Sequence, residues 1–537
     1  MRKTTTGPDT YDYIIVGAGA AGATLAEQLS ARSNRSVLVL ESGGRGIWNP
    51  LIPIPKASFF LMGSKWDSSY YPTNFDNGTG TVDYWQRGRV DGGSTAINGM
   101  QYDRAGAHYW NSVAAMADET WAWPRVLDVF RAIEDNELGP AESRGSGGPL
   151  SISVQREPDE LLDRISAAAK AYGLPWTEDL NSHDGERIGY IPNTIRRGRR
   201  VSTARAFLSR ALKRKNVTRI NNAHALRVYF DGTRAEAVEA LVDGNRRMFH
   251  AKAEIILSGG PIETPMLLER SGIGNPRVLN ELGVNTVVEQ PHVGEHAVEQ
   301  LFFGYQWKIN QNIGYYNQVG TLPRQALAGL KYLATGRGTI GTGAYDLGGF
   351  AKSNKALDHP DLFLMFAPFG LDLTATGMAP SPEPAVWGTG YLAHPTSESS
   401  VHATSINPFA PPAIDVHYLE DDWEQEAQKR IMEVAREIAA QSPLREIIVE
   451  EQMPGPDVQT RDEVRAFSMQ SGNAFHAVGT ARMGVDEDSV VDPALRVKGV
   501  EGLRVADASV LPRQPGNTMA PAILVGAMAA RILADEI

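Results

Sequence analysis

The sequence predicts an α/β fold whose first unit is a strand, a tight turn, a helix and a second strand. An apolar run, DYIIV, occupies residues 12–16, and the glycine-rich segment GAGAAG follows it at 17–22. Residues 21–33 carry apolar side chains at helical spacing, and a second apolar run, SVLVLE, occupies 36–41. This order is typical of the units that build parallel sheets with helices on their faces.

Composition limits the classes of protein to which the chain can belong. It has 537 residues, of which 42% are hydrophobic and 21% charged, and it contains no cysteine. Disulfides, thiolate metal sites and cysteine nucleophiles are therefore excluded. The 63 Asp and Glu residues outnumber the 52 Lys and Arg residues, and the formal net charge is -11. This acidity argues against nucleic acid as a partner and favours a small molecule.

Neither end of the chain has the pattern of a targeting or membrane segment. The N-terminal MRKTTTGPDTYDY has a basic start but no apolar run after it, so we interpret it as a ragged leader and not as a secretory signal. The longest apolar stretch, residues 519–530, is short and contains Pro521 and Gly526, which favours a buried helix. We expect a cytoplasmic protein with no membrane partner.

Three glycines and one glutamate form a dinucleotide-binding motif. Gly17, Gly19 and Gly22 have the order GxGxxG directly after the first strand. The first permits a tight turn, the second lets the backbone approach a pyrophosphate, and the third lets the helix pack closely on the strand. Glu41 ends the second strand 19 residues after Gly22, where a carboxylate can accept hydrogen bonds from an adenosine ribose.

Composition and periodicity predict further elements in order along the chain. The Gly/Ser/Pro stretch at 139–149 predicts a surface loop or linker. The Gly- and Pro-rich tract at 369–391 predicts a long loop, either a lid or a poorly ordered excursion. The segment LRVAD at 503–507 predicts a strand, followed by an apolar helix from about Asn517. Residues 421–440 predict a helix whose core-facing stripe is Trp423, Ala427, Ile431, Val434, Ala435 and Ile438.

Four longer motifs indicate more than a generic dinucleotide-binding fold. These are GRVDGGSTAING at 88–99, GGPIETPMLLERSGIG at 259–274, NAFHAVGTARMG at 473–484 and GLRVADASVLPRQPGNTMAPAI at 502–523. Together with GAGAAG and Glu41, they resemble the glucose-methanol-choline (GMC) oxidoreductase family, flavoenzymes that bind FAD and mostly oxidise alcohols. The resemblance is specific in the flavin-binding parts and diffuse between about 300 and 465.

The resemblance implies a Rossmann-like FAD-binding domain interleaved with a substrate-binding domain that is built on an antiparallel sheet with helices. The FAD-binding domain is then discontinuous and comprises 8–105, 195–300 and 470–537. The substrate-binding domain comprises 106–194 and 301–469.

Several residues are candidates for contact with FAD. Gly92 and Gly93 leave backbone unshielded, so a planar ring or phosphate can approach, and Ser94 and Asn98 add short polar groups. Asp507 follows a strand, where ligands of open α/β sheets collect. The resemblance adds Ala508, beside Asp507, along the FAD and places the backbone around Leu226 at the adenine.

His476 and Asn517 are the candidate catalytic pair. His476 lies in the nearly uncharged segment SGNAFHAVGT, and the resemblance places the histidine of this HxxGT motif at the flavin, as base toward the substrate hydroxyl. A histidine suits proton exchange near neutrality, so the rate is expected to rise with pH as the imidazolium loses its proton. Asn517 stands where the family has His or Asn, and it should hydrogen-bond the substrate oxygen and also lie near the cofactor.

The implied reaction is FAD-dependent oxidation of an alcohol to a carbonyl, with oxygen or another electron acceptor as the second partner. The alternative is a flavin-containing hydroxynitrile lyase of the same fold, in which the histidine does the acid/base work alone. A non-enzymatic flavin-binding scaffold is the third possibility, and the His476/Asn517 pair counts against it.

Four positions depart from the family pattern or deserve comment. Ile97 stands where some relatives attach FAD to a histidine, so we expect non-covalent FAD. Asp91 replaces an apolar residue, and HAVEQ at 296–300 replaces the usual N-L-x-D/E-H. Asp346 could face a polar or cationic alcohol, but a turn or surface aspartate is the favoured interpretation.

Two other patterns have an ordinary explanation. His292 and His296 have a spacing suited to metal binding, but Pro291 and Gly294 argue against a helix there and no third ligand is evident, so we expect no metal. The basic runs IRRGRR at 195–200 and ALKRKN at 211–216 lack interleaved aromatics, which favours a solvated face or a phosphate contact over nucleic acid.

Overall fold

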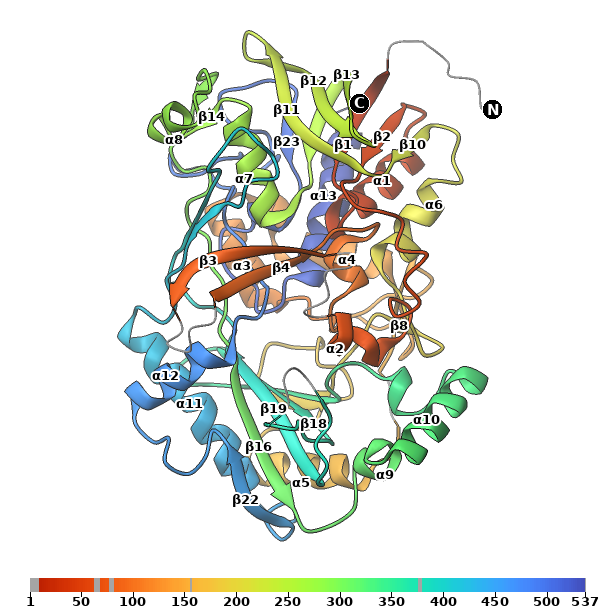
Figure 1. Ribbon diagram of the computed structural model, residues 1–537, viewed down its shortest axis with the longest axis vertical. Coiled ribbons are helices and arrows are strands. Elements are labelled where there is room, and N and C mark those ends of the chain that lie inside the picture. Colours follow the sequence, from red (N-terminus) through yellow and green to blue (C-terminus); the bar gives the residue numbers. More distant parts are fainter. Residues whose placement is uncertain (1–8, 62–67, 77–81, 155–156, 375–378, 537) are drawn as a thin grey trace.

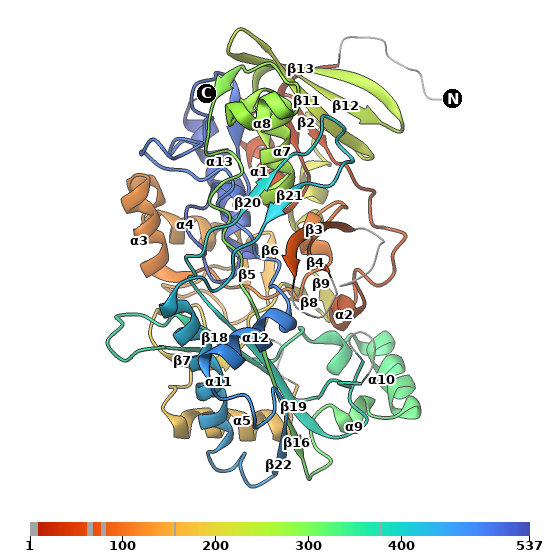
Figure 2. The same ribbon diagram turned by 60° about the vertical axis from the view of Figure 1, so that its left-hand side comes forward.

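The computed structural model of the protein describes residues 9–61, 68–76, 82–154, 157–374 and 379–536, and two large sheets organise it (Figures 1 and 2). A seven-stranded sheet lies in the upper part of both views and a six-stranded sheet in the lower part. The start of the predicted leader, residues 1–8, lies outside the described residues.

The seven-stranded sheet contains the predicted strand, turn, helix and strand. Its parallel part joins β1 to β2 and β13, β10 to β2, and β23 to β13, whereas β12 and β11 continue from β13 in antiparallel pairing. The strands are β1 (Thr10–Val16), β2 (Val37–Leu40), β10 (Val217–Ile220), β11 (Ala223–Asp231), β12 (Arg234–Val242), β13 (Asn245–Leu257) and β23 (Leu503–Val505).

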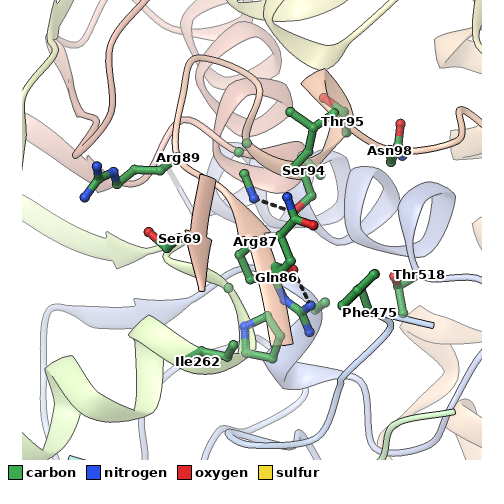
Figure 3. Close-up of a pocket in the computed structure, with 18 of the residues that line it drawn as sticks. Ser69, Gln86, Arg87, Arg89, Ser94, Thr95, Asn98, Ile262, Phe475 and Thr518 are labelled. Atoms are coloured by element: carbon green, nitrogen blue, oxygen red, sulfur yellow. Dashed lines mark hydrogen bonds between the residues drawn. The ribbon is translucent and has the colours of Figure 1, made fainter. Parts of the chain in front are cut away.

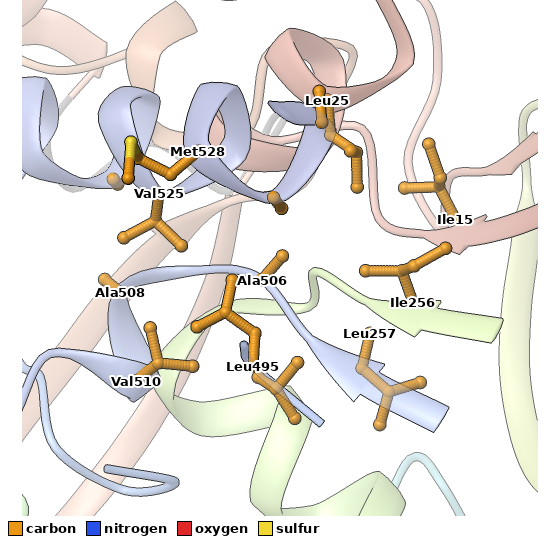
Figure 4. Packing of buried hydrophobic residues seen from close by; sticks show 14 of the residues in the cluster. Ile15, Leu25, Ile256, Leu257, Leu495, Ala506, Ala508, Val510, Val525 and Met528 are labelled. Atoms are coloured by element: carbon orange, nitrogen blue, oxygen red, sulfur yellow. The ribbon is translucent and has the colours of Figure 1, made fainter. Parts of the chain in front are cut away.

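Two helices cover one face of this sheet and bury its apolar side chains. They are α1 (Ala20–Arg32) and α13 (Met519–Asp535), and Figure 4 shows Leu25, Val525 and Met528 above strand residues such as Ile256. Gly526 lets the two helices approach closely, because a Cβ there would lie 2.2 Å from the carbonyl oxygen of Ala21. The apolar 519–530 segment is therefore a buried helix, as predicted.

The six-stranded sheet is antiparallel throughout, in the order β22, β16, β19, β18, β17, β7. The predicted helix at 421–440 is α11 (Asp422–Ala439), and it buries every predicted residue of its stripe except Trp423, which is 43% exposed in its first turn. The strands are β7 (Arg187–Tyr190), β16 (Phe303–Ile309), β17 (Leu347–Ala351), β18 (Leu362–Ala367), β19 (Ala385–Leu392) and β22 (Ile448–Met453).

The prediction of a long loop over 369–391 is wrong for its last seven residues. Residues 385–392 form β19, a fully buried strand between β16 and β18, and residues 375–378 lie outside the described ones. The glycines that suggested a loop make room for neighbours instead. A Cβ at Gly388 would lie 2.2 Å from the Tyr305 ring, and one at Gly390 would lie 2.4 Å from Ile431.

Shorter elements connect and flank the two sheets, and the segment 139–149 is irregular, as predicted. The other α-helices are α2 (Ser58–Leu61), α3 (Gly106–Met116), α4 (Trp123–Ile133), α5 (Glu160–Tyr172), α6 (Ser209–Ala211), α7 (Gly260–Arg270), α8 (Pro276–Glu281), α9 (Tyr316–Val319), α10 (Leu322–Thr335) and α12 (Arg461–Ser471). The other strands are β3 (Ser68–Asp76), β4 (Val82–Gly88), β5 (Glu134–Asn136), β6 (Leu150–Ile152), β8 (Ile195–Arg196), β9 (Arg199–Arg200), β14 (Ile273–Gly274), β15 (Val288–Glu289), β20 (Ser400–His402) and β21 (Ala413–Asp415).

The two sheets divide along the predicted segments. All strands of the seven-stranded sheet fall within 8–105, 195–300 and 470–537, and all strands of the six-stranded sheet fall within 106–194 and 301–469. The domain boundaries themselves stay a prediction. Within the described part of the chain, every helix is too short or too polar to cross a bilayer.

Candidate active site

A cavity of about 590 Å³ extends from the carboxyl ends of the parallel strands to the six-stranded sheet. Gly17, Glu41 and Ser258 line it where β1, β2 and β13 end. Tyr391 of β19 lines it from the other sheet. Figure 3 shows Ser94, Thr95 and Asn98 in the upper part of the cavity wall and Ile262 and Phe475 below.

The glycine turn at 17–22 is built to expose backbone to this cavity. Gly17 has φ 107°, and a Cβ there would lie 2.3 Å from the carbonyl oxygen of Ser258. A Cβ at Gly22 would lie 2.0 Å from the carbonyl oxygen of Gly17. At Gly19 the nearest atom to a Cβ is 4.0 Å away, and the residue lines the cavity. The fold therefore requires glycine at positions 17 and 22. At position 19 the fold would accept a side chain, and glycine is needed there only to leave room for a ligand.

The N-terminus of α1 is available to an anion. It has no side-chain cap and no acidic residue in its first turn. The unsatisfied N–H groups and the helix dipole favour negative charge at this end. Gly19, Ala20 and Ala21 line the cavity here, so a diphosphate would meet backbone donors directly.

Glu41 is buried at the end of β2 and lines the cavity. Its Oε2 accepts a hydrogen bond from the N–H of Ala18 (2.8 Å), and its Oε1 accepts one from the N–H of Gly43 (2.7 Å). Burial raises the pKa of this carboxyl to about 7 despite those two bonds. Each carboxylate oxygen has a further lone pair that can accept from a ribose hydroxyl.

The segment around η2 (Gly93–Ala96) contacts the first glycine turn. The N–H of Gly92 donates to Ala18 (2.8 Å), and a Cβ at Gly93 would lie 2.8 Å from the Cα of Gly19. Gly93, Ser94 and Asn98 line the cavity, whereas Gly92 lies just behind them. Asn98 is held by Arg200, whose Nη1 donates to the amide oxygen (2.9 Å).

The remaining predicted FAD contacts lie at different depths. Asp507 and Ala508 line the cavity, and Asp507 Oδ2 accepts from the N–H of Gly260 (2.8 Å) and the hydroxyl of Thr264 (2.7 Å). Burial raises the pKa of Asp507. Leu226 does not line the cavity, but the preceding residues of the same strand, 223–225, do.

His476 and Asn517 lie together at the cavity wall. The Asn517 Nδ2 is 3.4 Å from the His476 Nε2, and the Asn517 Oδ1 accepts from the N–H of Met519 (3.1 Å). That second bond assigns the amide orientation, so Nδ2 is the group that points at the imidazole. The edge of the Tyr391 ring packs on His476, with centroids 5.8 Å apart.

Gln300 fixes the tautomer of His476 from behind. The Gln300 Oε1 is 2.7 Å from the His476 Nδ1, and the Gln300 Nε2 donates to the carbonyls of Leu392 (2.6 Å) and Ala393 (3.3 Å). Because the amide oxygen can only accept, Nδ1 must carry the hydrogen. Nε2 therefore presents a lone pair on the side of Asn517.

Burial keeps His476 neutral. Burial, together with the positive charge of Arg87, lowers the pKa of the imidazole to about 3. The sequence led us to expect that His476 ionises near neutrality, but in the folded chain it does so far below pH 7. The rate should therefore not rise with pH between pH 5 and 8 as a result of this ionisation.

A buried carboxylate holds the backbone that carries His476. Glu299 accepts from the N–H groups of His476 (2.7 Å) and Ala477 (2.8 Å), and Arg87 Nη2 lies 3.7 Å from it. Sequence reasoning missed Glu299, Gln300 and Arg87. The sequence did contain a signal for Gln300, because in HAVEQ at 296–300 it takes the place of a family histidine.

The structure shows the surroundings of three positions whose roles the sequence left open. Asp91 is buried and paired with Arg219, and its Oδ1 accepts from Asn221 (2.7 Å). Ile97 lines the cavity and offers no nucleophile for covalent attachment. The favoured surface position of Asp346 is wrong, because it is buried beside Lys56 Nζ (3.7 Å) and does not line the cavity.

The two histidines considered as metal ligands lie in an irregular segment. The His292 Nδ1 is 3.1 Å from the His296 Nε2, and His296 Nδ1 is 2.7 Å from Glu398 Oε2. The described residues contain no group of three or more His, Cys, Asp or Glu arranged to hold a metal ion.

A two-sheet fold with a dinucleotide-type glycine loop, a buried glutamate at the end of β2 and a neutral histidine at the cavity wall is consistent with a flavin-dependent oxidoreductase. Family models described as GMC oxidoreductase match residues 11–300 and 395–526, and the chain belongs to this family. It is an FAD-dependent oxidoreductase that acts on CH–OH donors.

Relatives and solved structures span the whole chain. It is 34% identical to the mitochondrial choline dehydrogenase of Mus musculus, over 98% of this chain and 90% of that one. It is 32% identical to an alcohol dehydrogenase [acceptor] of Pseudomonas putida, over 98% and 96%. A crystal structure of pyridoxine 4-oxidase from Mesorbium loti superposes with a TM-score of 0.86 at 28% identity, over 97% and 98%.

The residues present fit FAD. Bare backbone at Gly19 and Gly93, the uncapped start of α1, and Glu41 at the end of β2 would supply the diphosphate and ribose contacts that a dinucleotide needs. The cavity then continues to His476, as an elongated cofactor with a reactive ring at its far end requires.

Proposed function

We propose that the protein oxidises an alcohol to a carbonyl compound with His476 as the base. The observation that carries this proposal is the Nε2 lone pair of a neutral imidazole, which the bond between Nδ1 and Gln300 directs toward Asn517 and the cavity. FAD, when bound, accepts the hydride of the carbinol carbon.

His476 takes the hydroxyl proton as the carbonyl forms. An imidazole whose pKa is about 3 is a weak base toward a ground-state alcohol. The hydroxyl becomes far more acidic as hydride leaves the adjacent carbon, so proton transfer is favourable only in concert with that step. The positive charge then develops on a partly buried ring, where the Gln300 oxygen stabilises the Nδ1–H.

Asn517 orients the substrate oxygen. Its Nδ2 and the His476 Nε2 lie 3.4 Å apart on the same wall, so a hydroxyl in the cavity beside both atoms can accept from the amide and donate to the imidazole. Asn517 cannot accept the proton itself, because an amide is not a base near neutrality.

We assign the substrate to uncharged alcohols with an apolar or aromatic body. Aromatic side chains form much of the wall around His476, with Phe302 5.9 Å from Tyr391 between ring centroids, and the charged group that acts on His476 there is the cation Arg87. The carboxylates that line the cavity, Glu41, Glu263 and Asp507, belong to the part near α1 and α7. FAD is held non-covalently, because Ile97 is inert, and oxygen or another acceptor removes the electrons.

Anaerobic stopped-flow measurement of flavin reduction with a panel of alcohols tests the proposal. We expect His476→Ala to lower the reduction rate by about 10² to 10⁴-fold with FAD still bound. Asn517→Ala should cost less, because the base remains. His394→Ala is the matched control, since His394 is also partly buried and its pKa is also lowered, to about 4, but it does not line the cavity.

A His476→Ala rate within threefold of wild type would remove the histidine from the mechanism. Cleavage of a hydroxynitrile with no loss of flavin colour would favour the lyase alternative. Reoxidation of the reduced enzyme by air, compared with reoxidation by an artificial quinone, identifies the class of acceptor.

A further inference from the structure

The helix α10 presents its apolar side to solvent. At 3.6 residues per turn, Leu322, Leu327, Leu330 and Leu333 fall within an arc of about 140°. They are 80%, 69%, 66% and 79% exposed. Tyr332 lies on the opposite side and is buried, and its hydroxyl donates to the carbonyl of Gly198 (2.9 Å). An amphipathic helix of a globular protein normally has the reverse orientation.

A second group of exposed apolar side chains lies in the segment 45–61. Trp48 is 90% exposed, and Ile47 and Phe60 are both 66% exposed. Phe60 belongs to α2, whose Phe59 lines the cavity. Seven of the most exposed large apolar side chains of the described chain therefore come from two segments.

The β8–β9 hairpin lies between these two segments. Arg200 on β9 donates from its backbone N–H to Pro53 (3.0 Å) and from Nε to Ile52 (2.9 Å), and Gly198 at the turn packs on the carbonyl of Gly336 after α10. Both views place α2, β8 and α10 together on the right (Figures 1 and 2). We call this surface, formed by residues 45–61, the hairpin and α10, the basic apolar face.

Charge is segregated onto the segments that form this face. Residues 45–61, 195–200 and 322–335, which form this face, contain eight of the 52 lysines and arginines and none of the 63 aspartates and glutamates. Arg196, Arg197 and Arg199 of the hairpin are exposed, as are Arg324 and Arg337 in and beside α10. A chain with a net charge of -11 thus carries a cationic surface that includes exposed Leu and Trp side chains.

We propose that the basic apolar face binds the surface of an anionic lipid bilayer. The leucines of α10, with Trp48 and Phe60, would enter the boundary between headgroups and acyl chains, and the arginines would meet the phosphates. Nucleic acid would leave the apolar side chains in water. A symmetric dimer through this face would set arginine against arginine.

Sedimentation of the purified holoprotein with vesicles tests this proposal. We expect binding to phosphatidylglycerol vesicles about tenfold or more above binding to phosphatidylcholine vesicles, and loss of most of that binding in 1 M sodium chloride, where the screening length falls to about 3 Å. Brominated lipid should quench tryptophan fluorescence in the wild type and much less in Trp48→Phe.

Paired substitutions separate this face from the rest of the surface. Leu330→Glu with Leu333→Glu should abolish vesicle binding, while Val449→Glu with Val485→Glu, at exposed apolar residues elsewhere, should leave it unchanged. Retained FAD and unchanged flavin reduction in solution would show that both variants are folded. Equal binding by the two paired variants, or no binding by the wild type, would overturn the proposal. A concentration-dependent dimer that only the α10 variant abolishes, without vesicle binding, would assign the face to a second copy.

Discussion

The tautomer of His476 depends on the side chain of Gln300. The amide oxygen faces Nδ1 only because the Gln300 Nε2 is occupied by the carbonyls of Leu392 and Ala393. The Gln300 oxygen faces Nδ1 and the Asn517 Nδ2 faces Nε2. Both amides therefore favour the tautomer with its hydrogen on Nδ1. Gln300 does not line the cavity, so it acts on the substrate through the histidine.

Replacing Gln300 therefore tests a positioning role. Gln300→Leu removes the acceptor, so the ring can place its hydrogen on Nε2, and we expect kcat to fall about 10 to 100-fold with little change in KM and with FAD retained. Steady-state kinetics and the flavin-to-protein ratio check this outcome. Loss of FAD together with loss of activity would indicate a structural role instead.

Gln300→Glu gives a signature in the pH profile. A carboxylate at 2.7 Å from Nδ1 would stabilise the imidazolium and raise the pKa of His476 from about 3 toward neutrality. The base is active only when deprotonated, so the rate should fall as the pH drops below this raised pKa, whereas the wild-type rate stays flat above about pH 5. A flat profile in Gln300→Glu would contradict the arrangement.

We expect Asp346 to contribute to stability and not to substrate choice. It is buried, accepts from the Tyr315 hydroxyl (2.5 Å) and pairs with Lys56. Burial raises the pKa of Asp346 and lowers that of Lys56, and their mutual attraction opposes both shifts. Asp346→Asn leaves a buried ammonium without its anion, so we expect a loss of about 3 kcal/mol in unfolding free energy.

Denaturant unfolding of Asp346→Asn, compared with the exposed Asp358→Asn, measures this effect. The order of preference among charged and neutral alcohols should not change, because Asp346 does not line the cavity. A changed order with unchanged stability would refute this role.

Local motifs predicted the residues that meet the cavity, but not those behind them. His476 and Asn517 each stand in a segment whose composition is informative by itself. Gln300 is 176 positions from His476, and nothing in a single sequence states that the two side chains touch. Asp346 was misassigned for the same reason, because its partner Lys56 lies 290 positions away, in the short 3-10 helix Pro55–Ala57.

At the scale of elements, the glycines in the turn between β1 and α1 have two different roles, one in folding and one in cofactor binding. Gly17 and Gly22 would clash with the protein's own backbone if they carried a Cβ, whereas Gly19 faces open cavity. Gly19→Val should therefore fold and yet give nearly colourless protein, because the side chain occupies the place of the pyrophosphate.

Gly17→Ala is the contrasting variant. Its φ of 107° and a contact of 2.3 Å to the Ser258 carbonyl predict lower stability even without FAD. The flavin-to-protein absorbance ratio and the melting temperature of the flavin-free forms distinguish the two effects. Full FAD loading of Gly19→Val would show that the phosphates bind elsewhere.

Helical periodicity and uninterrupted apolar runs predicted their elements correctly, and the prediction failed at a buried strand that glycines interrupt. The helix α11 was found from its stripe, and the unit β1, α1, β2 from its apolar runs and glycines. The strand β19 was taken for loop, because Gly388 and Gly390 serve packing against Tyr305 and Ile431, contacts that arise only in the assembled sheet. Trp423 was wrongly predicted to be buried, because a residue in the first turn of a helix can lie outside the apolar stripe that packs on the core.

At the scale of the whole molecule, the cavity is where the two sheets meet. Its walls come from the ends of β1, β2 and β13, from β18 and β19 through Met365 and Tyr391, and from the C-terminal segment that carries His476 and Asn517. FAD bound there would contact chain segments more than 400 residues apart in sequence, so its binding energy adds to the stability of the complete fold.

Removal of FAD should therefore destabilise the protein, and its return should restore stability in a concentration-dependent way. Free FAD at 100 times its dissociation constant contributes about 2.7 kcal/mol, and at 1,000 times about 4.1 kcal/mol, so the melting temperature should rise with the logarithm of added FAD. Riboflavin, which lacks the diphosphate and adenosine, should restore much less, because the uncapped end of α1 and Glu41 would stay without a ligand. Calorimetry of the flavin-free protein with each compound, and with Gly19→Val as the non-binding control, measures both effects. Equal protection by riboflavin and FAD would mean that the glycine turn of α1 contributes nothing to cofactor binding.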